Sequence, residues 1–415
     1  MRGAAVRPIV IAAGGTGGHL FPAEALTAAL VARGHRVALM TDARSGAASR
    51  EAFAGREVFV LPGAGIAGRG LRRGAAAAVS LARGTLRAWA ILARIDACAV
   101  VGFGGYPSVA PALGARLLRR APPVLLHEQN AVLGRANRFL ASRAAGLALS
   151  FAATARVPEG VAATITGNPV RPAIRARAGA AYDTDDADGR LRLLVLGGSL
   201  GARVFADLLP EAIAKLPEAL RRRIVLAQQC RNEDLARLRA AYAAADFAWE
   251  AAPFFADVAP RLAAAQFVIA RAGASTVAEL AAIGRPAILV PLPGAIDDHQ
   301  SANTRPLAAA GAAEAIAQGG LTPALLAERL ADWLGDAPRR ARAAAAAAAL
   351  GHAAAAERLA DLVERSIAPA TEGARAGGRC RYRSARSISS ASAASACPAS
   401  PRCCTRWATR CRAAI

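Results

Sequence analysis

The chain has 415 residues, of which 54% are hydrophobic and 20% are charged. This length exceeds one ordinary core and suits two α/β domains, while the apolar fraction excludes a disordered protein. The charge-free stretch 97–115 is long enough to cross a bilayer, but Gly104, Gly105 and Pro107 interrupt it, so a spanning helix is not expected. The apolar run 8–13 is too short for a signal peptide, which predicts a cytoplasmic protein.

The formal net charge is +22, and nine arginines without any acid lie beyond residue 372. The remaining excess, spread over the body, favours anionic partners such as phosphates or acidic lipid headgroups. Lys215 is the single lysine, so no P-loop is present. A nucleic-acid-binding protein is a competing interpretation. It is disfavoured because only 5% of the residues are aromatic, too few to interleave stacking rings with the basic residues.

Short apolar runs alternate with Ala-, Leu- and Arg-rich helical stretches, which predicts parallel βαβ units. In the first half, a helix is expected over 20–33, ended by Gly34, and strands at 8–13, 37–40, 57–61, 97–101 and 124–127. In the second half, strands are expected at 193–196, 224–227, 267–270 and 287–290. Each half opens with a strand, a glycine loop and a helix. The sequence therefore predicts an α/β fold of two Rossmann-like parallel-sheet domains facing across a cleft.

The expected division along the chain follows shifts in composition. A first domain spans 1–172, an exposed linker 173–190, a second domain 191–350 and a C-terminal helix 351–370, the end of an Ala-dense helical stretch that begins at 339. Residues 371–415 are rich in Arg, Ser and Cys without a period, which predicts disorder; a frame-shifted end is the alternative. The body holds only Cys98 and Cys230, as expected in a reducing compartment.

A glycine loop, residues 14–19, joins the first expected strand to the first helix. Backbone amides of such a loop and the start of the helix favour an anion, although a ligand-free turn is the alternative. The loop is not the dinucleotide fingerprint, because Leu20 stands where its third glycine would be. His19 closes the loop, and an imidazole there could transfer a proton near neutral pH.

Six motifs follow one another along the chain: 14–23 (GGTGGHLFPA), 127–130 (HEQN), 167–171 (GNPVR), 197–202 (GGSLGA), 271–279 (RAGASTVAE) and 297–303 (DDHQSAN). In order and spacing, over about residues 7–365, they resemble the MurG family of peptidoglycan N-acetylglucosaminyltransferases. The resemblance implies a two-domain GT-B glycosyltransferase that inverts the anomeric carbon of UDP-N-acetylglucosamine. Its implied acceptor is the 4-hydroxyl of N-acetylmuramoyl-pentapeptide on undecaprenyl pyrophosphate. Its implied location is peripheral, on the cytoplasmic face of the bacterial inner membrane.

The resemblance also implies a UDP-N-acetylglucosamine site, made of Thr16, Gly17, Gly18, Asn130, Arg171, Ser199, Phe255, Ala274, Ser275, Thr276, Val277, Ala278, Glu279, His299 and Gln300. Two helix starts, at 197–202 and 273–276, offer amides and hydroxyls that suit a diphosphate. By the same resemblance, Glu279 would bind the ribose hydroxyls and the backbone of Phe255 would lie against the uracil. Gln300 is favoured for the donor sugar, with His299 as the alternative.

No metal or other cofactor is expected. Asp183 with Asp185, and Asp186 with Asp188, have the spacing of a metal-binding Asp-x-Asp pair, but both pairs lie in the expected linker and are interpreted as solvated acids. The leaving diphosphate would instead be stabilised by the helix starts.

The proton of the acceptor hydroxyl requires a base, and His19 and Glu128 are the two candidates. Asn130 suits orientation, since an amide has no useful pKa. Arg171 could reach a diphosphate with both arms of its guanidinium. The sequence leaves the base open, because His19 could instead hold the acceptor pyrophosphate.

Between Arg69 and Arg94, an apolar stripe recurs at helical spacing: Leu71, Ala75, Val79, Ala82, Leu86 and Trp89. Arginines 72, 83, 87 and 94 flank it, which predicts an interfacial helix that binds anionic lipids. An ordinary helix packed on the sheet is the alternative. The loop 102–108, with Tyr106, is expected at the acceptor site.

Two other functions remain open among enzymes. One is a GT-B transferase that glycosylates a different membrane lipid, such as diacylglycerol; the segments 127–130 and 167–171 weigh against it. The other is a catalytically impaired relative, suggested by the unusual composition of residues 371–415.

Overall fold

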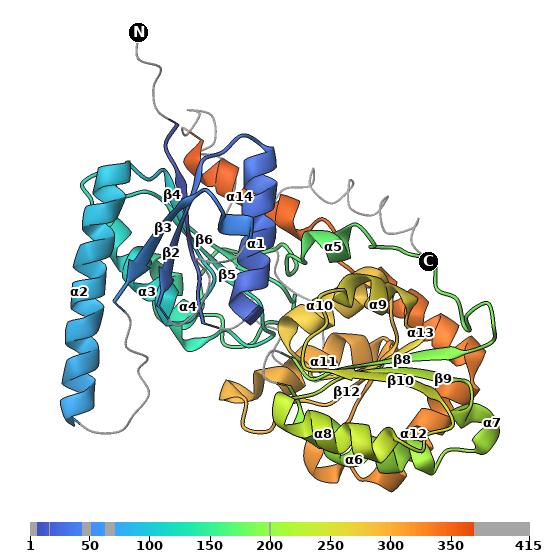
Figure 1. The fold of residues 1–415 in the computed structure, drawn as a ribbon. Helices are drawn as coiled ribbons and strands as arrows, with labels where there is room; N and C mark the ends of the chain where they lie inside the picture. The colour runs from blue at the N-terminus through green and yellow to red at the C-terminus, as the bar shows by residue number, and fades with distance from the viewer. Residues whose placement is uncertain (1–5, 16, 44–50, 63–70, 199–200, 369–415) are drawn as a thin grey trace, which may run out of the picture. The chain divides into compact units, whose positions relative to one another are not determined.

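The computed structural model describes residues 6–15, 17–43, 51–62, 71–198 and 201–368. It contains two sheets in which every described strand pair is parallel (Figure 1). The first has the order β3-β2-β1-β4-β5-β6-β7 and the second the order β10-β9-β8-β11-β12-β13. Each sheet with its covering helices is called a lobe below. The predicted pair of Rossmann-like parallel-sheet domains is confirmed.

The strands of the first lobe are β1 (Ile9–Ala12), β2 (Val37–Asp42), β3 (Glu57–Leu61), β4 (Ala99–Gly102), β5 (Val124–Glu128), β6 (Gly146–Leu149) and β7 (Ala163–Ile165). Its helices are α1 (Gly17–Ala32), η2 (Glu51–Phe53), α2 (Leu71–Ile95), α3 (Tyr106–Arg116), α4 (Arg135–Leu140) and η3 (Ala141–Arg143). The sequence did not predict β6 and β7, which are short.

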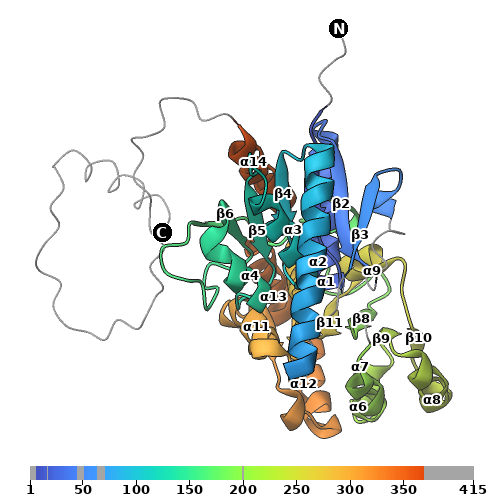
Figure 2. The same cartoon turned by 90° about the vertical axis from the view of Figure 1, so that its left-hand side faces the viewer.

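The central strand β1 shows why this chain makes a buried parallel sheet. All four of its side chains are buried, and they alternate between two cores. Ile9 and Ile11 pack in the core that includes Leu26 of α1, whereas Val10 and Ala12 pack in the core that includes Leu92 of α2. Because side chains alternate along a strand, a continuous apolar run is what a sheet covered on both faces requires. Figure 2 shows α2 and α3 over one of these faces.

The strands of the second lobe are β8 (Leu191–Leu196), β9 (Ile224–Gln229), β10 (Ala248–Ala252), β11 (Phe267–Ala270), β12 (Ala287–Leu289) and β13 (Ala313–Ala315). Its helices are α6 (Arg203–Ala214), α7 (Glu218–Arg221), α8 (Asn232–Tyr242), α9 (Val258–Ala264), α10 (Ala274–Ile283), η4 (Ile296–Asp298), α11 (His299–Ala309), η5 (Gln318–Gly320), α12 (Pro323–Gly335) and α13 (Ala337–Ala349). Strand β8 alternates as β1 does: Leu193 and Val195 share a core with Phe205 of α6, and Leu194 shares another with Leu280 of α10.

The Ala-dense stretch 339–370, predicted as helical, contains two helices. Helix α13 ends at Ala349, and α14 (Ala355–Ile367) follows a short break. At the break, a side chain on Gly351 would lie 2.7 Å from the carbonyl oxygen of Ala281, so only glycine allows this close approach. Helix α14 then packs beside α1, and its residues Leu359 and Val363 join the core that contains Ile9 (Figure 1). The first lobe is therefore completed by the last described helix.

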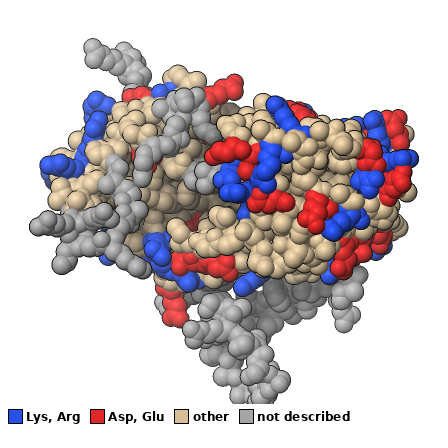
Figure 3. All heavy atoms as spheres, turned by 60° about the horizontal axis from the view of Figure 1, so that its bottom comes forward, with Lys and Arg blue, Asp and Glu red and all other residues tan. Residues whose placement is uncertain are grey.

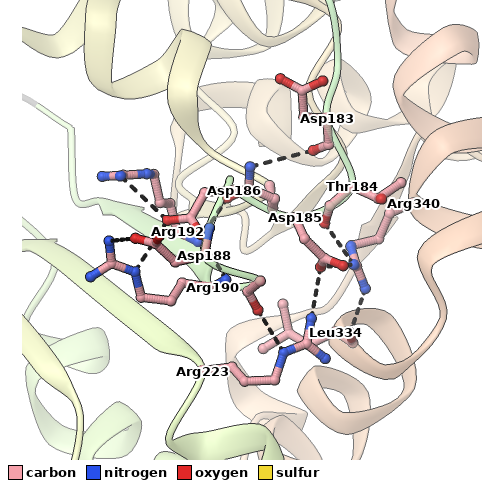
Figure 4. Close-up of polar contacts among 12 residues, drawn as sticks. Asp183, Thr184, Asp185, Asp186, Asp188, Arg190, Arg192, Arg223, Leu334 and Arg340 are labelled. Atoms are coloured by element: carbon pink, nitrogen blue, oxygen red, sulfur yellow. Dashed lines mark hydrogen bonds and ion pairs between the residues drawn. The ribbon is translucent and has the colours of Figure 1, made fainter.

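The stretch predicted as an exposed linker is anchored to the second lobe. It contains the short helix α5 (Pro172–Arg175), and the hydroxyl of Tyr182 donates to the carbonyl oxygen of Gln266 at 2.7 Å. Asp185 accepts hydrogen bonds from Arg223 at 2.8 Å and Arg340 at 3.3 Å (Figure 4). Since the Arg340 side chain is only 1% exposed, its charge needs this partner. Asp185 therefore anchors the segment although its side chain is 35% exposed, whereas the side chain of Asp188 is 68% exposed, as expected of a solvated acid.

Candidate active site

The carboxyl ends of β1, β4 and β5 bring three loops of the first lobe together, where open α/β sheets bind ligands. Gly14 lets the loop after β1 pack close to its neighbours, because a side chain there would lie 2.8 Å from the ring of Pro107 and 2.9 Å from Asp42. Helix α1 begins at Gly17, earlier than expected, so Gly17, Gly18 and His19 form its first turn. Thr16 lies outside the described residues.

His19 is half-buried and is held by the end of β5. Its Nδ1 lies 3.0 Å from the side-chain oxygen of Gln129. The Gln129 amide nitrogen in turn lies 2.9 Å from the carbonyl oxygen of Phe103 and 3.1 Å from Nδ1 of His127. His127 is fully buried, and this burial lowers its pKa to about 4, so the ring is neutral at physiological pH. The histidine that sequence reasoning singled out is therefore the partly exposed end of a buried hydrogen-bonded chain.

Glu128, the other candidate base, is 2% exposed and its carboxylate is fully used by the loop that follows β5. One oxygen accepts from the backbone and side-chain nitrogens of Asn130, both at 3.1 Å. The other accepts from the backbone nitrogen of Gly134 and the side chain of Asn137, both at 2.9 Å. Because a carboxylate offers about four acceptor positions, none remains for a substrate proton. This geometry assigns Glu128 to organising the loop and leaves His19 as the candidate base.

Tyr106, expected at the acceptor site, begins α3 directly after Gly105. Its hydroxyl is buried and has no hydrogen-bond partner among the residues that the structure describes. Gly105 lies against His19, since a side chain on it would come within 3.6 Å of the His19 Nε2 atom. Tyr106 and His19 therefore belong to the same corner of the first lobe.

In the second lobe, the start of α10 has the features expected of an anion site. Gly273 precedes the helix, and Ala274, Ser275 and Thr276 form its first turn, whose amides have no partner within the helix. The Ser275 hydroxyl is buried and unpartnered within the described part of the chain. Free amides, a helix dipole and a free hydroxyl together suit a phosphate. The first turn of α10 is followed by Val277, which is buried in the core, and Ala278.

Glu279 lies one turn further along α10 and pairs with Arg171, which follows β7 and directly precedes α5. The guanidinium Nε and Nη2 atoms each lie 2.8 Å from a carboxylate oxygen, and the guanidinium also covers the ring of Phe21 on α1 at 4.6 Å. The Glu279 side chain is 7% exposed and that of Arg171 is 26% exposed. Two residues predicted for the donor site are thus brought together, as an ion pair that joins the lobes at α1 and α10.

Asn303 of α11 makes a second connection between the lobes, which sequence reasoning did not assign. Its side-chain oxygen accepts from the backbone nitrogen of Ala131 at 2.8 Å, and its nitrogen donates to Asn130 at 3.2 Å and to the carbonyl of Ala272 at 3.1 Å. Asn303 is fully buried. The sequence contained it within the segment 297–303, but nothing in that pattern indicated which backbone groups it would meet.

The loop after β12 carries His299 and Gln300. The Gln300 oxygen accepts from the backbone nitrogen of Leu292 at 2.9 Å, and its NH2 group makes no hydrogen bond to another described residue. Nδ1 of His299 lies 2.7 Å from the carbonyl oxygen of Ile296, so this ring is used to shape the loop. Asp297, in the left-handed conformation, approaches Arg156 and Arg138 of the first lobe; the hydrogen bond from Arg156 lowers the pKa of its carboxyl.

The remaining residues predicted for the donor site follow β8 and β10, on the same sheet edge. The side-chain oxygen of Gln229 accepts from Gly197 at 3.2 Å, and its nitrogen donates to the carbonyl of Pro253 at 3.2 Å, which ties the two loops together. Phe255 is buried, and the guanidinium of Arg261 covers its ring at 4.3 Å. Ser199 lies outside the described residues.

Within the described ranges, no group of three or more His, Cys, Asp or Glu side chains is arranged to hold a metal ion. Tyr182, Asp185, Arg192 and Gln266 line a cavity of about 700 Å³. It lies at the start of β8, away from the loops described above, and its Asp185 and Asp186 are engaged by arginines or backbone nitrogens. One member of each Asp-x-Asp pair, Asp185 and Asp186, is therefore held by the protein itself.

Helix α2 has two different faces in the first lobe. Ala88 and Leu92 are buried, whereas Val79, Leu86 and Trp89 are 52%, 58% and 42% exposed. The side chains of residues 71–75 lie outside the described part. None of the helices in the described ranges has both the length and the hydropathy needed to cross a membrane. Elsewhere, one face of the molecule carries acidic and basic side chains intermingled, with no large patch of one sign (Figure 3).

Comparison with known families identifies the chain. Residues 9–149 match the model of the glycosyltransferase family 28 N-terminal domain, and residues 192–359 match that of the family 28 C-terminal domain. The chain belongs to glycosyltransferase family 28. The first match covers β1 to β6 of the first lobe and the second covers the strands of the second lobe from residue 192 on, while β7 lies outside both.

Family 28 members close to this chain carry one shared name, "UDP-N-acetylglucosamine--N-acetylmuramyl-(pentapeptide) pyrophosphoryl-undecaprenol N-acetylglucosamine transferase". The protein of Granulibacter bethesdensis is 58% identical over 88% of this chain and 95% of its own length. That of Acidiphilium cryptum is 55% identical over 89% and 99%. Among solved structures, MurG of Acinetobacter baumannii is 31% identical with a TM-score of 0.71, covering 86% of this chain and 99% of its own. The resemblance to the MurG family is confirmed.

Proposed function

We propose that this family 28 glycosyltransferase moves N-acetylglucosamine from UDP-N-acetylglucosamine to the 4-hydroxyl of N-acetylmuramoyl-pentapeptide on undecaprenyl pyrophosphate. The observation that carries the proposal is the identity of 50 to 58% to curated relatives that all bear the name of this transferase. Within the described part of the chain, no hydrogen bond is made by Nε2 of His19 or by the buried Ser275 hydroxyl, which is consistent with a base and an anion-binding group.

In the proposed reaction, the acceptor 4-oxygen attacks the anomeric carbon of the donor sugar from the side opposite to UDP. The new oxygen–carbon bond forms as the bond from that carbon to the diphosphate oxygen breaks, and UDP leaves with the electron pair. His19 takes the hydroxyl proton. The amides of Ala274, Ser275 and Thr276 stabilise the charge that develops on the leaving diphosphate.

The proposed donor contacts follow the same assignment. Glu279 accepts from the ribose hydroxyls and keeps Arg171 beside the diphosphate, while the NH2 group of Gln300 meets the sugar. The backbone at Phe255 lies against the uracil. Gly17 and Gly18, in the first turn of α1, belong to the proposed donor site, and Tyr106 belongs to the acceptor side.

The enzyme is further proposed to act as a peripheral protein on the cytoplasmic face of the inner membrane. Val79, Leu86 and Trp89 would enter the interface, beside the exposed arginines 83, 87 and 94, which would meet anionic headgroups.

The test is transfer of radiolabelled N-acetylglucosamine from UDP-N-acetylglucosamine to the polyprenyl pyrophosphoryl acceptor, with diacylglycerol as the competing acceptor. Product from the first alone supports the proposal. Product from diacylglycerol alone would favour a transferase for a different lipid, and product from neither would indicate an impaired relative.

A further inference from the structure

The side chain of Gln129 occupies the space between two histidines at the end of β5. It is 1% exposed, so each of its polar atoms needs a protein partner. Its oxygen lies 3.0 Å from Nδ1 of His19. Its nitrogen lies 2.9 Å from the carbonyl oxygen of Phe103 and 3.1 Å from Nδ1 of His127. The donor and the acceptor of each of these hydrogen bonds can therefore be assigned from the atoms that are able to donate.

The carbonyl of Phe103 determines how the amide is turned. A primary amide has one acceptor oxygen and two N–H donors, whereas a carbonyl oxygen can only accept. The backbone carbonyl of His127, at 3.3 Å from the same nitrogen, is a second obligate acceptor. The NH2 group must therefore face Phe103 and His127, and the oxygen must face His19.

His127 imposes the same direction from its own side. Its Nε2 lies 3.2 Å from the carbonyl oxygen of Gly167, which can only accept, so Nε2 carries the hydrogen. Burial keeps the ring neutral by lowering its pKa to about 4, and a neutral ring has one hydrogen only. Nδ1 of His127 is therefore a lone pair that accepts from Gln129, in agreement with the amide orientation that Phe103 requires.

We propose that Gln129 is a positioning residue that holds His19 in the tautomer with its hydrogen on Nδ1 and its lone pair on Nε2. The argument is that the Gln129 oxygen can only accept, so the His19 atom 3.0 Å away must donate. The inference rests on the proposed function, in which His19 is the base. It adds the residue that selects the reactive tautomer.

The selected lone pair lies on the accessible side of the ring. A side chain on Gly105, directly before α3, would come within 3.6 Å of Nε2, and the glycine there, with a φ of +67°, leaves this side of the ring without that side chain. In the other tautomer, Nε2 would carry a hydrogen and could not accept the acceptor's proton. After transfer, both ring nitrogens carry hydrogens, and the Gln129 oxygen still accepts from Nδ1 while the ring is positively charged.

The direct test is long-range proton–nitrogen NMR of the full chain labelled with ¹⁵N-histidine, without substrates, at a pH at which His19 is neutral. The His19 signals are assigned by their loss in His19→Gln. We expect Nδ1 to have the nitrogen shift of a protonated ring atom and Nε2 that of an unprotonated one. The reverse pattern would overturn the proposal, whether or not the protein transfers N-acetylglucosamine.

Variants then test the role of Gln129. In Gln129→Met the acceptor is lost, so the tautomer preference should disappear and kcat should fall about 10- to 100-fold with little change in the donor KM. Gln129→Glu keeps an acceptor towards Nδ1 and should retain the Nδ1–H tautomer. Gln228→Met is the matched control, since Gln228 is also a fully buried glutamine but pairs with Tyr242 in the second lobe.

An unchanged His19 tautomer in Gln129→Met would show that the amide does not select it and would overturn the proposal. If Gln129→Met does not fold, the spectrum of the unaltered chain still decides. A protein with the expected tautomer but without transfer activity would instead contradict the proposed function alone.

Discussion

The two lobes share a strand–loop–helix design, yet the polar groups at their carboxyl edges are used differently. In the first lobe, the buried side chains of Glu128 and Gln129 are hydrogen-bonded within the protein, Glu128 to the loop that follows β5 and Gln129 to Phe103. Gln129 also holds the half-buried ring of His19. In the second lobe, the Ser275 hydroxyl and the first-turn amides of α10 have no partner among the described residues. Under the proposed function, the first lobe holds His19 for proton transfer and the second offers donors to a diphosphate; the Tyr106 hydroxyl, also buried and unpartnered among the described residues, is the exception in the first lobe.

The largest effect on the transfer rate is expected when the imidazole of His19 is removed. His19→Ala should lower kcat by about 100- to 10,000-fold, the usual contribution of a general base, with UDP affinity unchanged. Rates of radiolabel transfer and calorimetric titration with UDP measure the two quantities. His35→Ala, a histidine of the same lobe that pairs with Glu364, is the control. Retention of activity within a few-fold would remove His19 from the proton transfer.

The next effect concerns the buried network of the first lobe. Because His127 has a pKa of about 4 in the folded chain and an ordinary value near 6.5 when unfolded, the unfolded state binds more protons between these values. The free energy of unfolding should therefore fall as the pH drops from 6.5 to 4, by about 3 kcal/mol. Denaturant titrations at several pH values measure it.

His127→Gln should flatten that pH dependence, since glutamine can still donate to the carbonyl of Gly167 but does not titrate. His352, whose pKa is also lowered, mainly by burial, contributes equally to both proteins and cancels in the difference. Parallel profiles for the two proteins would contradict the prediction.

A smaller effect is expected in the second lobe, which is proposed to bind UDP-N-acetylglucosamine. Glu279→Gln removes the negative charge proposed to accept from the ribose, and it should weaken UDP binding about 10- to 100-fold, the range for hydrogen bonds to a charged group. Isothermal titration with UDP measures the change. Glu314→Gln, an acid of the second lobe that bonds to Trp333, should leave the affinity unaltered. Equal affinities in all three proteins would exclude Glu279 from the donor site.

The smallest effect concerns the exposed face of α2. Replacing Leu86 and Trp89 together by Ser removes apolar surface that the proposal places in the interface, and it should weaken binding to phosphatidylglycerol vesicles about tenfold. Sedimentation with vesicles measures the bound fraction. Leu350→Ser, which changes an exposed leucine of the second lobe, is the control. Unchanged partitioning of the double variant would leave α2 as an ordinary surface helix.

Much of this arrangement could be predicted from short stretches of sequence. The buried run at 8–13, the glycine loop that ends in His19 and the helix start at Gly273 each depend on neighbours within a few residues. The stripe of α2 was also predictable, because a helical period of 3.6 determines which side chains share a face. Ala82, Leu86 and Trp89 are indeed exposed, while Ala88 and Leu92 are buried on another face.

Other features depended on contacts between distant parts of the chain. A C-terminal helix was predicted over 351–370 without a place in either half, whereas the structure shows α14 completing the core of the first lobe beside α1. Glu128 was a candidate base from its residue type. In the structure, the nitrogens of Gly134 and Asn137 donate to its carboxylate, which organises the loop after β5. The local sequence does not predict which donors a carboxylate will meet.

The sequence by itself determined the two parallel-sheet lobes, the family and the residue types at each strand end, because strand and helix periods and glycine turns are local properties. Only the tertiary structure decided which of those residues is reactive and which is structural. The state of His19 depends on a carbonyl of Phe103 that is 84 positions away, and a hydrogen bond's direction follows from the atoms that folding brings within 3 Å.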